Sequence, residues 1–490
     1  MRLDELVAGA DSTRIVGDGS AEIADLAYDS RKVGPGTLFF CVPGEKVDGH
    51  EFAAAAVEAG AAGLVVEREL PELGVAQVVV PEARAAMAPL AARFWGDPTR
   101  ELRVVGITGT NGKTTTAFLI REILEAAGEQ CGLLGTVKQM VGGVEEEVER
   151  TTPEAIDLQA TFRRMRDGGD KVCAMEVSSH ALALHRADAI DFDIALFTNL
   201  TQDHLDFHAD MEDYFHSKRL LFAAGPGKAI VNLDDEYGRR LAREFECVTF
   251  SAEGRDADFA AHDVSYDTGG SSFTVAVGGE VRVRTRLPGH FNVANALGAF
   301  VAAIGLGVDP ETAVAGLAGA PPPPGRFEPI DEGQDFAVLV DYAHTPDSLQ
   351  NVLRAARPLT AGRVISVFGA GGDRDRGKRP LMGRAGAELS DLAIVTSDNP
   401  RSERPEAIVE EVLAGVGDRG GVEVEPDRRA AIGLALARAR PGDTVVIAGK
   451  GHEQGQEFEG GRKVPFDDRE VAREELRRLQ GGARSVAEPA

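Results

Sequence analysis

The chain has 490 residues, of which 43% are hydrophobic and 27% charged, and its formal net charge is −26 at pH 7. This length predicts about three globular domains, and the negative charge argues against non-specific binding to nucleic acid or to an anionic membrane. Four scattered cysteines with no Cys-x-x-Cys pattern argue against a disulfide framework and against a zinc site. No signal peptide or membrane-spanning apolar run is found, so we expect a cytoplasmic protein without membrane insertion.

Residues 1–98 are predicted to form a small α/β domain. In this domain Asp29-Ser30-Arg31 follows a strand and is interpreted as a turn, with a polar ligand site as the alternative. Residues 96–98, Gly-Asp-Pro, then interrupt the chain and predict a hinge. The expected strands are 24–29, 37–42, 63–67 and 75–80, and the expected helix is 52–59.

The second domain, residues 99–324, is organised around the segment 106–116, GITGTNGKTTT. An apolar run precedes this segment and an amphipathic run follows it, which is the strand–loop–helix context of a phosphate-binding loop. The Walker pattern is incomplete, because it expects glycine where Ile107 stands. An ordinary turn with a solvated lysine is therefore the alternative.

The chemistry of this loop follows from its residue types. Gly109 and Gly112 allow the backbone to approach a phosphate, and the N–H groups at the start of the helix would face the anion. Lys113 would reach the β- and γ-phosphates, and Thr114 would bind Mg²⁺.

Further strands of the second domain carry polar residues at their carboxyl ends, where ligands bind in open α/β sheets. The strand 171–176 ends in Glu176, placed as an acid that holds Mg²⁺ would be, although a helix-capping role is the alternative. The strand 193–198 leads to His204, which is either a metal ligand or a solvated loop residue. Lys218 lies on an expected helix, and nothing in its spacing separates it from a solvated or ion-paired lysine.

A third domain, residues 325–490, is predicted after the proline run 321–324, which would form a semi-rigid linker. Its strands alternate with helical runs, which predicts a parallel sheet, and a polar cluster follows each strand. Because these clusters share one edge of the sheet, they predict a site. The strands are 336–340, 364–368, 392–396 and 444–448, and the clusters are DYAH at 341–344, GGDR at 371–374, DNPR at 398–401 and GKGHE at 449–453.

The arginines of this domain suit an anionic ligand. Arg374 lies in a basic run, and guanidinium groups bind carboxylates and phosphates in a forked geometry. A salt-bridged loop is the alternative for this run, and a proline turn is the alternative for residues 398–401.

Taken together, these motifs resemble the Mur ligases of peptidoglycan synthesis. The motifs that carry the resemblance are GTNGKT at 109–114, TTP at 151–153, EVSSH at 176–180, NLTQDH at 199–204, DYAH at 341–344, DNPR at 398–401 and GKGHE at 449–453. The resemblance covers nearly the whole chain. It implies an α/β fold of three domains: a small amino-terminal domain, a central P-loop, doubly wound mononucleotide-binding domain, and a Rossmann-like carboxyl-terminal domain.

The resemblance also implies a reaction. ATP would phosphorylate the glutamyl γ-carboxylate of a UDP-N-acetylmuramoyl-dipeptide, and the amine of meso-diaminopimelate would displace phosphate from the acyl phosphate. Cations must then shield the nucleotide from the carboxylate. We expect a monomer whose third domain swings onto the nucleotide about hinges near Pro98 and residues 321–324.

Site residues follow from the resemblance position by position. Lys113, Glu176, His204 and Lys218 would be catalytic, with Lys218 modified to a CO₂-derived carbamate (N6-carboxylysine). Metal ligands would be Thr114, Glu176, His204 and the Lys218 carbamate. ATP would contact Gly109, Thr110, Asn111, Gly112, Lys113, Thr114, Thr115, Asn295 and Arg326. The UDP-linked substrate would contact Ser30, the loop 45–47, Thr151, Thr152, Ser178 and Arg186, while Leu184 stands where some members have glutamine. Diaminopimelate would contact Arg374, Asp398, Asn399, Pro400, Arg401, Gly449 and Glu453.

The diaminopimelate residues have a physical rationale. An arginine can fork onto the extra carboxylate of diaminopimelate, and Glu453 can pair with its far ammonium. Lysine lacks that carboxylate and would leave buried charge unpaired. Two other hypotheses stay open at this point: a folylpolyglutamate synthase type of ligase, and a nucleotide-gated binding protein without turnover.

Overall fold

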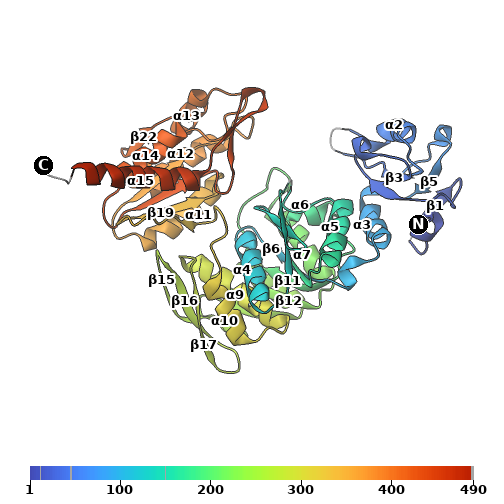
Figure 1. Ribbon diagram of the computed structural model, residues 1–490, viewed down its shortest axis with the longest axis horizontal. Helices are drawn as coiled ribbons and strands as arrows, with labels where there is room; N and C mark the ends of the chain where they lie inside the picture. Colours follow the sequence, from blue (N-terminus) through green and yellow to red (C-terminus); the bar gives the residue numbers. More distant parts are fainter. Residues whose placement is uncertain (11–12, 45–46, 149, 487–490) are drawn as a thin grey trace. The chain divides into compact units, whose positions relative to one another are not determined.

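The computed structural model describes residues 1–10, 13–44, 47–148 and 150–486 (Figure 1). Contacts divide the chain into two compact units, Met1–Phe250 with Gly298–Ala313, and Ser251–Leu297 with Val314–Ala490. Each unit is described on its own. No helix within the described ranges has both the length and the apolar character needed to cross a bilayer.

The first sheet of the chain has the order β1-β5-β4-β3-β2, with parallel pairing except for the β1 edge. Strands β3 and β4 are buried along their whole length, as expected of parallel strands covered on both faces. Alternate residues point to opposite faces, so Phe40 and Val65 pack with α1 and α3, whereas Phe39 and Leu64 pack with α2. The elements are α1 (Leu3–Leu6), β1 (Arg14–Val16), β2 (Asp25–Ala27), β3 (Thr37–Phe40), α2 (Ala53–Glu58), β4 (Gly63–Val66), β5 (Ala76–Val79) and α3 (Ala83–Phe94).

The second sheet contains the strand that leads into the glycine loop. Its order is β13-β12-β11-β6-β10-β7-β8-β9, parallel from β13 to β7, with β8 and β9 added antiparallel. The loop therefore lies at the centre of the sheet, between the ends of β10 and β11. The strands are β6 (Arg103–Thr108), β7 (Cys131–Leu134), β8 (Gln139–Val141), β9 (Val144–Glu146), β10 (Val172–Glu176), β11 (Phe192–Phe197), β12 (Lys228–Asn232) and β13 (Cys247–Ser251). The helices are α4 (Lys113–Ala126), α5 (Ala155–Asp167), α6 (Ser179–Ala183), α7 (Met211–Ala223) and α8 (Glu236–Glu244).

After β13 the chain forms the short strand β14 (Phe259–Ala260) and then a three-stranded antiparallel sheet, β15-β16-β17. This sheet was not predicted. Two helices follow. The elements are β15 (His262–Asp267), β16 (Gly270–Ala276), β17 (Glu280–Thr285), α9 (His290–Gly305) and α10 (Pro310–Gly319).

The last large sheet has the order β18-β19-β23-β20-β21-β22, parallel except at β18. One face packs on α11, α12 and α13, and the other on α14 and α15. A hairpin, β24-β25, precedes α15. The strands are β18 (Glu328–Pro329), β19 (Ala337–Asp341), β20 (Val364–Phe368), β21 (Leu392–Val395), β22 (Val422–Val424), β23 (Thr444–Ala448), β24 (Gly455–Phe458) and β25 (Arg462–Pro465). The helices are α11 (Pro346–Ala356), α12 (Lys378–Leu389), α13 (Pro405–Leu413), α14 (Arg428–Arg438) and α15 (Asp468–Val486).

Most predicted strands are confirmed to within one or two residues, including β20 and β23 at their predicted bounds. The cysteines carry no disulfide: Cys41, Cys131 and Cys173 are buried and Cys247 is half-buried. The compact units do not separate residues 1–98 from the adjoining residues 99–250, so the domain boundaries at residues 98 and 324 stay predictions.

Candidate active site

The glycine loop connects the buried strand β6 to helix α4, as predicted. Gly109 has φ 148° and Gly112 has φ 87°, a backbone region that side chains rarely adopt. A Cβ on Gly109 would lie 1.9 Å from Thr198 Oγ1 and 2.9 Å from the carbonyl oxygen of Asn199, so no larger residue fits there without movement of the segment that follows β11. The loop is held at its side by Asn199, whose carbonyl accepts from Thr110 N at 2.8 Å and whose Oδ1 accepts from Asn111 N at 2.9 Å.

Two lysines from different helices meet on one carbonyl of this loop. Lys113 Nζ donates to Gly109 O at 2.9 Å and to Thr110 O at 2.8 Å. Lys218 Nζ, from α7, donates to the same Gly109 O at 2.8 Å and lies 4.6 Å from the Tyr214 ring centre. Lys218 is only 1% exposed, and burial, reinforced by the nearby Lys113 ammonium, holds its pKa well below the ordinary value. Lys218 is therefore a buried amine beside the phosphate loop and not the solvated lysine that its spacing alone allowed.

Glu176 and Thr114 form an oxygen-rich pair next to the loop. Thr114 Oγ1 donates to Glu176 Oε1 at 2.9 Å, and Thr136 donates to the same carboxylate from its N–H at 2.7 Å and its hydroxyl at 3.1 Å. A Cβ on Gly135 would lie 2.5 Å from Glu176 Oε1, so this glycine leaves the space that the carboxylate fills. A hydroxyl and a carboxylate suit Mg²⁺, and the open backbone of the loop suits a phosphate, so the residues present fit both groups.

His204 follows β11 in a left-handed backbone conformation with φ 55°. Its ring centre lies 4.9 Å from that of His180, and its Nε2 lies 3.5 Å from Asp203 Oδ2. Burial lowers the pKa of His204, as it lowers the pKa of His180 to about 4, so both imidazoles are neutral near pH 7 and can act as ligands. The described residues contain no preformed cluster of three or more His, Cys, Asp or Glu side chains suited to a metal.

Of the residues predicted to contact the UDP-linked substrate, Thr152, Ser178 and Arg186 lie close to Glu176, whereas Ser30 and the loop 45–47 belong to the predicted first domain. Thr152 Oγ1 donates to Glu176 O at 2.9 Å and accepts from Ser178 N at 3.2 Å, and Arg186 Nη1 donates to Thr152 O at 3.4 Å. Ser30 begins the 3-10 turn Ser30–Lys32, and its carbonyl accepts a hydrogen bond from the backbone N–H of Val33. In the predicted loop 45–47, residues 45 and 46 lie outside the described residues.

Arg186 is held by an acid that the sequence did not reveal. Glu154, 5% exposed, pairs with Arg186 at 3.0 Å, with Arg150 at 2.7 Å and with Arg84 at 3.2 Å. Three guanidinium groups around one carboxylate leave a local positive charge in an acidic protein. This excess suits an anionic substrate group at Arg186.

The predicted adenine-side residues lie in the second unit. Asn295, on α9, is 6% exposed and donates through Nδ2 to Asn292 Oδ1 at 3.0 Å. The Arg326 guanidinium lies 4.8 Å from the Tyr342 ring centre, and its buried Nε has no hydrogen-bond partner among the described residues. His452 also packs on Tyr342, with its ring centre 5.0 Å from that of the tyrosine. Flat, cationic surfaces of this kind suit a nucleotide base.

The clusters 398–401 and 449–453 come together at the carboxyl ends of β21 and β23. Asn399 Nδ2 donates to Glu453 Oε2 at 3.0 Å, and Lys450 Nζ donates to Asn399 Oδ1 at 2.8 Å and to Glu453 Oε2 at 2.9 Å. Asp398 lies behind them, 6% exposed. Burial opposes ionisation of Asp398, but the charges of Arg428 and Lys450 outweigh it and lower its pKa. Gly449 allows this approach, because a Cβ there would lie 3.2 Å from Asp398 Oδ2.

The two predicted arginines flank Gly371. Arg401 Nη1 donates to Gly372 O at 2.8 Å and its Nε donates to Glu457 Oε2 at 3.0 Å. A Cβ on Gly371 would lie 3.2 Å from Arg401 Nη1 and 3.7 Å from Arg374 Cγ, so both arginine side chains lie next to Gly371. The site therefore has a positive part near Gly371 and a negative part at Glu453.

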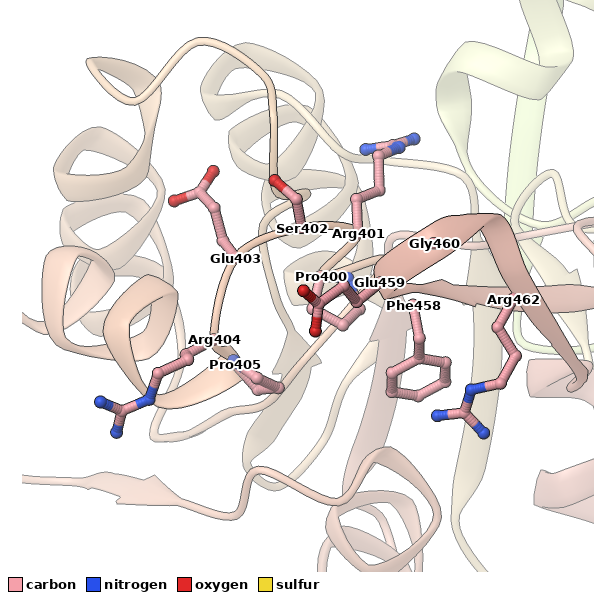
Figure 2. Close-up of a pocket in the computed structure, with 10 residues that line it drawn as sticks. All are labelled: Pro400, Arg401, Ser402, Glu403, Arg404, Pro405, Phe458, Glu459, Gly460 and Arg462. Carbon is pink, nitrogen blue, oxygen red and sulfur yellow. The ribbon is translucent and has the colours of Figure 1, made fainter.

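A pocket of about 540 Å³ lies on the far side of the turn that carries Arg401 (Figure 2). Pro400 and Phe458 contribute its apolar lining, and Arg404 and Arg462 lie at its ends. In Figure 2 the Arg401 side chain leaves the turn on the side opposite Phe458 and Arg462. The guanidinium predicted to bind substrate thus points away from this pocket and toward Gly372.

Three site residues were missed by the sequence reasoning. Thr136 belongs to no motif, and only its contacts reveal it, whereas Glu154 directly follows the motif TTP at 151–153 and could have been found there. Lys450 lies inside the GKGHE motif, so its position could have been found there. The available signal was its place directly after the apolar strand 444–448, within a cluster of polar residues.

Family models match three successive stretches of the chain. These are the Mur ligase family, catalytic domain, over residues 22–95; the Mur ligase middle domain, over residues 107–303; and the Mur ligase, glutamate ligase domain, over residues 325–451. The three-domain α/β architecture with a central nucleotide-binding domain is thereby confirmed.

Similar proteins align over nearly the full length. The UDP-N-acetylmuramoyl-L-alanyl-D-glutamate–2,6-diaminopimelate ligases of Streptomyces coelicolor and Streptomyces avermitilis are each 49% identical, over 95% and 94% of this chain and 94% of each relative. A solved structure of a ligase with the same name is 32% identical, with a TM-score of 0.72, and the alignment covers 98% of this chain and 99% of that one. The chain therefore belongs to the Mur ligase family.

Proposed function

We propose that this protein joins meso-diaminopimelate to the γ-carboxylate of UDP-N-acetylmuramoyl-L-alanyl-D-glutamate, with conversion of ATP to ADP and phosphate. Mur ligases are ATP-dependent amide ligases that use Mg²⁺. The observation that carries the proposal is the meeting of Lys113, Lys218 and the Thr114–Glu176 pair around one glycine loop. Phosphoryl transfer to a carboxylate needs cations near the phosphates, which Lys113 and a Mg²⁺ ion held by Thr114 and Glu176 would supply.

The loop and its lysine would bind the phosphates of ATP. Lys113 now donates to the carbonyls of Gly109 and Thr110, and a phosphate oxygen would take over these hydrogen bonds. Gly112 and Thr115 would face the phosphates through their N–H groups. Thr110 and Asn111, whose N–H groups donate to Asn199, would border the nucleotide and hold the shape of the loop. When bound, Mg²⁺ would neutralise phosphate charge, with Thr114 and Glu176 as its oxygen ligands and His204 near a second ion.

Lys218 would act as a carbamate. Its neutral amine would attack the carbon of CO₂, an N–C bond would form, one C=O electron pair would move to oxygen, and a proton would leave to solvent. The low pKa of Lys218 favours this step, because only the neutral amine is a nucleophile. The charge reversal would also change the repulsion between Lys218 and Lys113 into attraction, and would supply an anion that orients a metal.

The dipeptide end of the substrate would lie along Thr151, Thr152, Ser178 and Arg186, with Arg186 on a carboxylate. Ser30, in the 3-10 turn between β2 and β3, would contact the uridine nucleotide. Arg186 is well suited to its role because Glu154 fixes its orientation.

The incoming amino acid would use both parts of the site at the ends of β21 and β23. Arg374 and Arg401 would bind the far carboxylate of diaminopimelate, and Glu453 its ammonium. Asn399 and the turn at Pro400 would shape the pocket, with Asp398 and Gly449 supporting it. Asn295 and Arg326 would contact the adenine side of ATP.

We also propose the domain boundaries 1–98, 99–324 and 325–490, a cytoplasmic monomer, and movement of the third domain during turnover. Scattering measurements should show compaction when ATP and both other substrates or their analogues are bound. Unchanged dimensions would contradict the proposed movement.

A substrate panel tests the function. Phosphate release is expected only when ATP, the UDP-linked dipeptide and meso-diaminopimelate are all present, and lysine should support at most a few per cent of the rate. Equal rates with lysine would refute the proposed specificity. Turnover with folylpolyglutamate substrates in place of the UDP-linked dipeptide would refute the proposed substrate class, and the absence of any turnover would refute the enzyme proposal.

A further inference from the structure

We propose that Lys450 is a positioning residue for the amino-acid site, and that it aims one oxygen of Glu453 at the substrate ammonium. The inference rests on the proposed function. Lys450 follows β23 closely and is fully buried, with 0% of its surface exposed. It therefore cannot contact a substrate itself and would act through the residues that it holds.

The contacts of Lys450 form a closed triangle. Its ammonium donates to Asn399 Oδ1 at 2.8 Å and to Glu453 Oε2 at 2.9 Å, and Asn399 Nδ2 donates to the same Glu453 oxygen at 3.0 Å. Each member therefore touches the other two. Because two donors converge on Glu453 Oε2, the direction of the carboxylate is set.

The triangle also fixes the amide of Asn399. Its Oδ1 accepts a second hydrogen bond, from Glu457 N at 3.0 Å. A flipped amide would turn its NH₂ group toward two donors, the Lys450 ammonium and the Glu457 N–H, and would lose its bond to Glu453. One orientation is therefore strongly preferred, and Lys450 supplies much of that preference.

The consequence for Glu453 is an asymmetric carboxylate. Its Oε2 is occupied by two donors, whereas no donor within the described part of the chain reaches its Oε1. The side chain of Glu453 is 33% exposed, so this second oxygen has access to a ligand. An oriented carboxylate oxygen of this kind suits an alkylammonium group.

Charge balance supports the same role. Asp398 Oδ1 lies 3.6 Å from Lys450 Nζ, and this buried oxygen has no hydrogen-bond partner among the described residues. Asp398 and Glu453 carry two negative charges, and Lys450 supplies one positive charge between them. Arg428 also acts on Asp398, but it is paired with Asp468 at 2.6 Å. These five groups therefore keep a net negative charge that attracts a cation, while the carboxylates of Asp398 and Glu453 stay close together.

The test is a graded series of substitutions at Lys450. Lys450→Arg retains the charge and donors, Lys450→Gln retains a neutral donor, and Lys450→Met retains only length. The KM for meso-diaminopimelate should rise in that order, by about 10- to 100-fold for Lys450→Met. The KM values for ATP and the UDP-linked dipeptide, and kcat at saturating amino acid, should change by less than about threefold. The predicted order of KM values applies to any two of these variants. If one variant does not fold, the KM values of the remaining variants still test the proposal.

A double-mutant cycle with Glu453→Gln separates positioning from general destabilisation. If Lys450 acts through Glu453, adding Lys450→Met to Glu453→Gln should raise the KM much less than it does in the wild type. Additive effects would overturn the inference. The matched control is Arg363→Met, which removes a cation paired with Asp443 at 2.7 Å at the amino-terminal ends of β20 and β23. It should leave the KM for diaminopimelate unchanged.

The outcomes of the two proposals are distinguishable. If the wild type does not use meso-diaminopimelate, the proposed function fails. If the wild type uses it but Lys450→Met leaves its KM unchanged, or raises all three KM values and lowers kcat together, only the positioning role fails.

Discussion

Replacing Lys218 with methionine should abolish most of the activity and leave the fold nearly intact. The substitution removes one hydrogen bond, from Nζ to Gly109 O at 2.8 Å, and that carbonyl keeps its bond from Lys113. One such bond contributes about 0.5–1.5 kcal/mol net, and loss of a buried amine offsets part of this. The free energy of unfolding should therefore change by about 1 kcal/mol or less.

The effect on turnover should be much larger. If a carbamate on Lys218 orients a metal ion, its loss should lower kcat by about 10- to 100-fold or more, as loss of groups that orient metal sites does. ADP formation at saturating substrates measures this rate, and thermal unfolding measures stability. Lys218→Ala, which leaves space, should be partly rescued by formate or acetate.

The matched control is Lys228→Met. Lys228 also donates its ammonium to a backbone carbonyl, that of Gly305, but at the protein surface. Its replacement should leave kcat unchanged. Wild-type protein exposed to ¹³C-labelled bicarbonate should show a carbamate signal that Lys218→Met lacks. Full activity of Lys218→Met, or an active wild type without carbamate, would refute the reasoning.

Two further predictions concern the loop and the carboxyl-terminal sheet. Gly109→Ala should abolish ATP binding in titration calorimetry, because its Cβ would lie 1.9 Å from Thr198 Oγ1. Gly128→Ala, also at positive φ but with nothing within 4 Å of the added carbon, should cost about 1–2 kcal/mol of stability and leave binding intact. The hydrogen bond from Arg379 lowers the pKa of Glu403 to about 2, so this carboxylate stabilises the fold above about pH 4.3, and the stabilisation is lost as the pH falls toward 2. Glu403→Gln should flatten the pH dependence of unfolding in that window, and an unchanged slope would contradict this assignment.

The strands that position the site could be predicted because buried strands consist almost entirely of apolar residues. β20 and β23 are continuous apolar runs, and such runs indicate buried parallel strands. By contrast, the antiparallel sheet that β15 joins was overlooked, although β17 alternates Val281 and Val283 with charged residues as a half-buried strand does. The mostly exposed β15 gives a weaker signal.

Site residues that belong to a sequence motif could be predicted, whereas most of those outside the motifs could not. The glycine loop and Glu176 were found because spacing and strand ends constrain them. Lys218 could be found only by resemblance, because its burial under the loop comes from the packing of α7, which a single lysine does not reveal. Thr136 contacts Glu176 from a segment 40 residues away in the sequence, and a pairing of that kind is absent from any local pattern. Glu154 directly follows the motif TTP and was overlooked.

The central claim is that the glycine loop directs phosphoryl transfer from ATP to a substrate carboxylate. Single-turnover analysis with ¹⁸O in the γ-carboxylate of the UDP-linked dipeptide tests it most directly. We expect one ¹⁸O atom in each phosphate released, because the acyl phosphate loses its bridging oxygen with phosphate when the amine attacks. Label in AMP, or amide formation with no label in phosphate, would contradict the account.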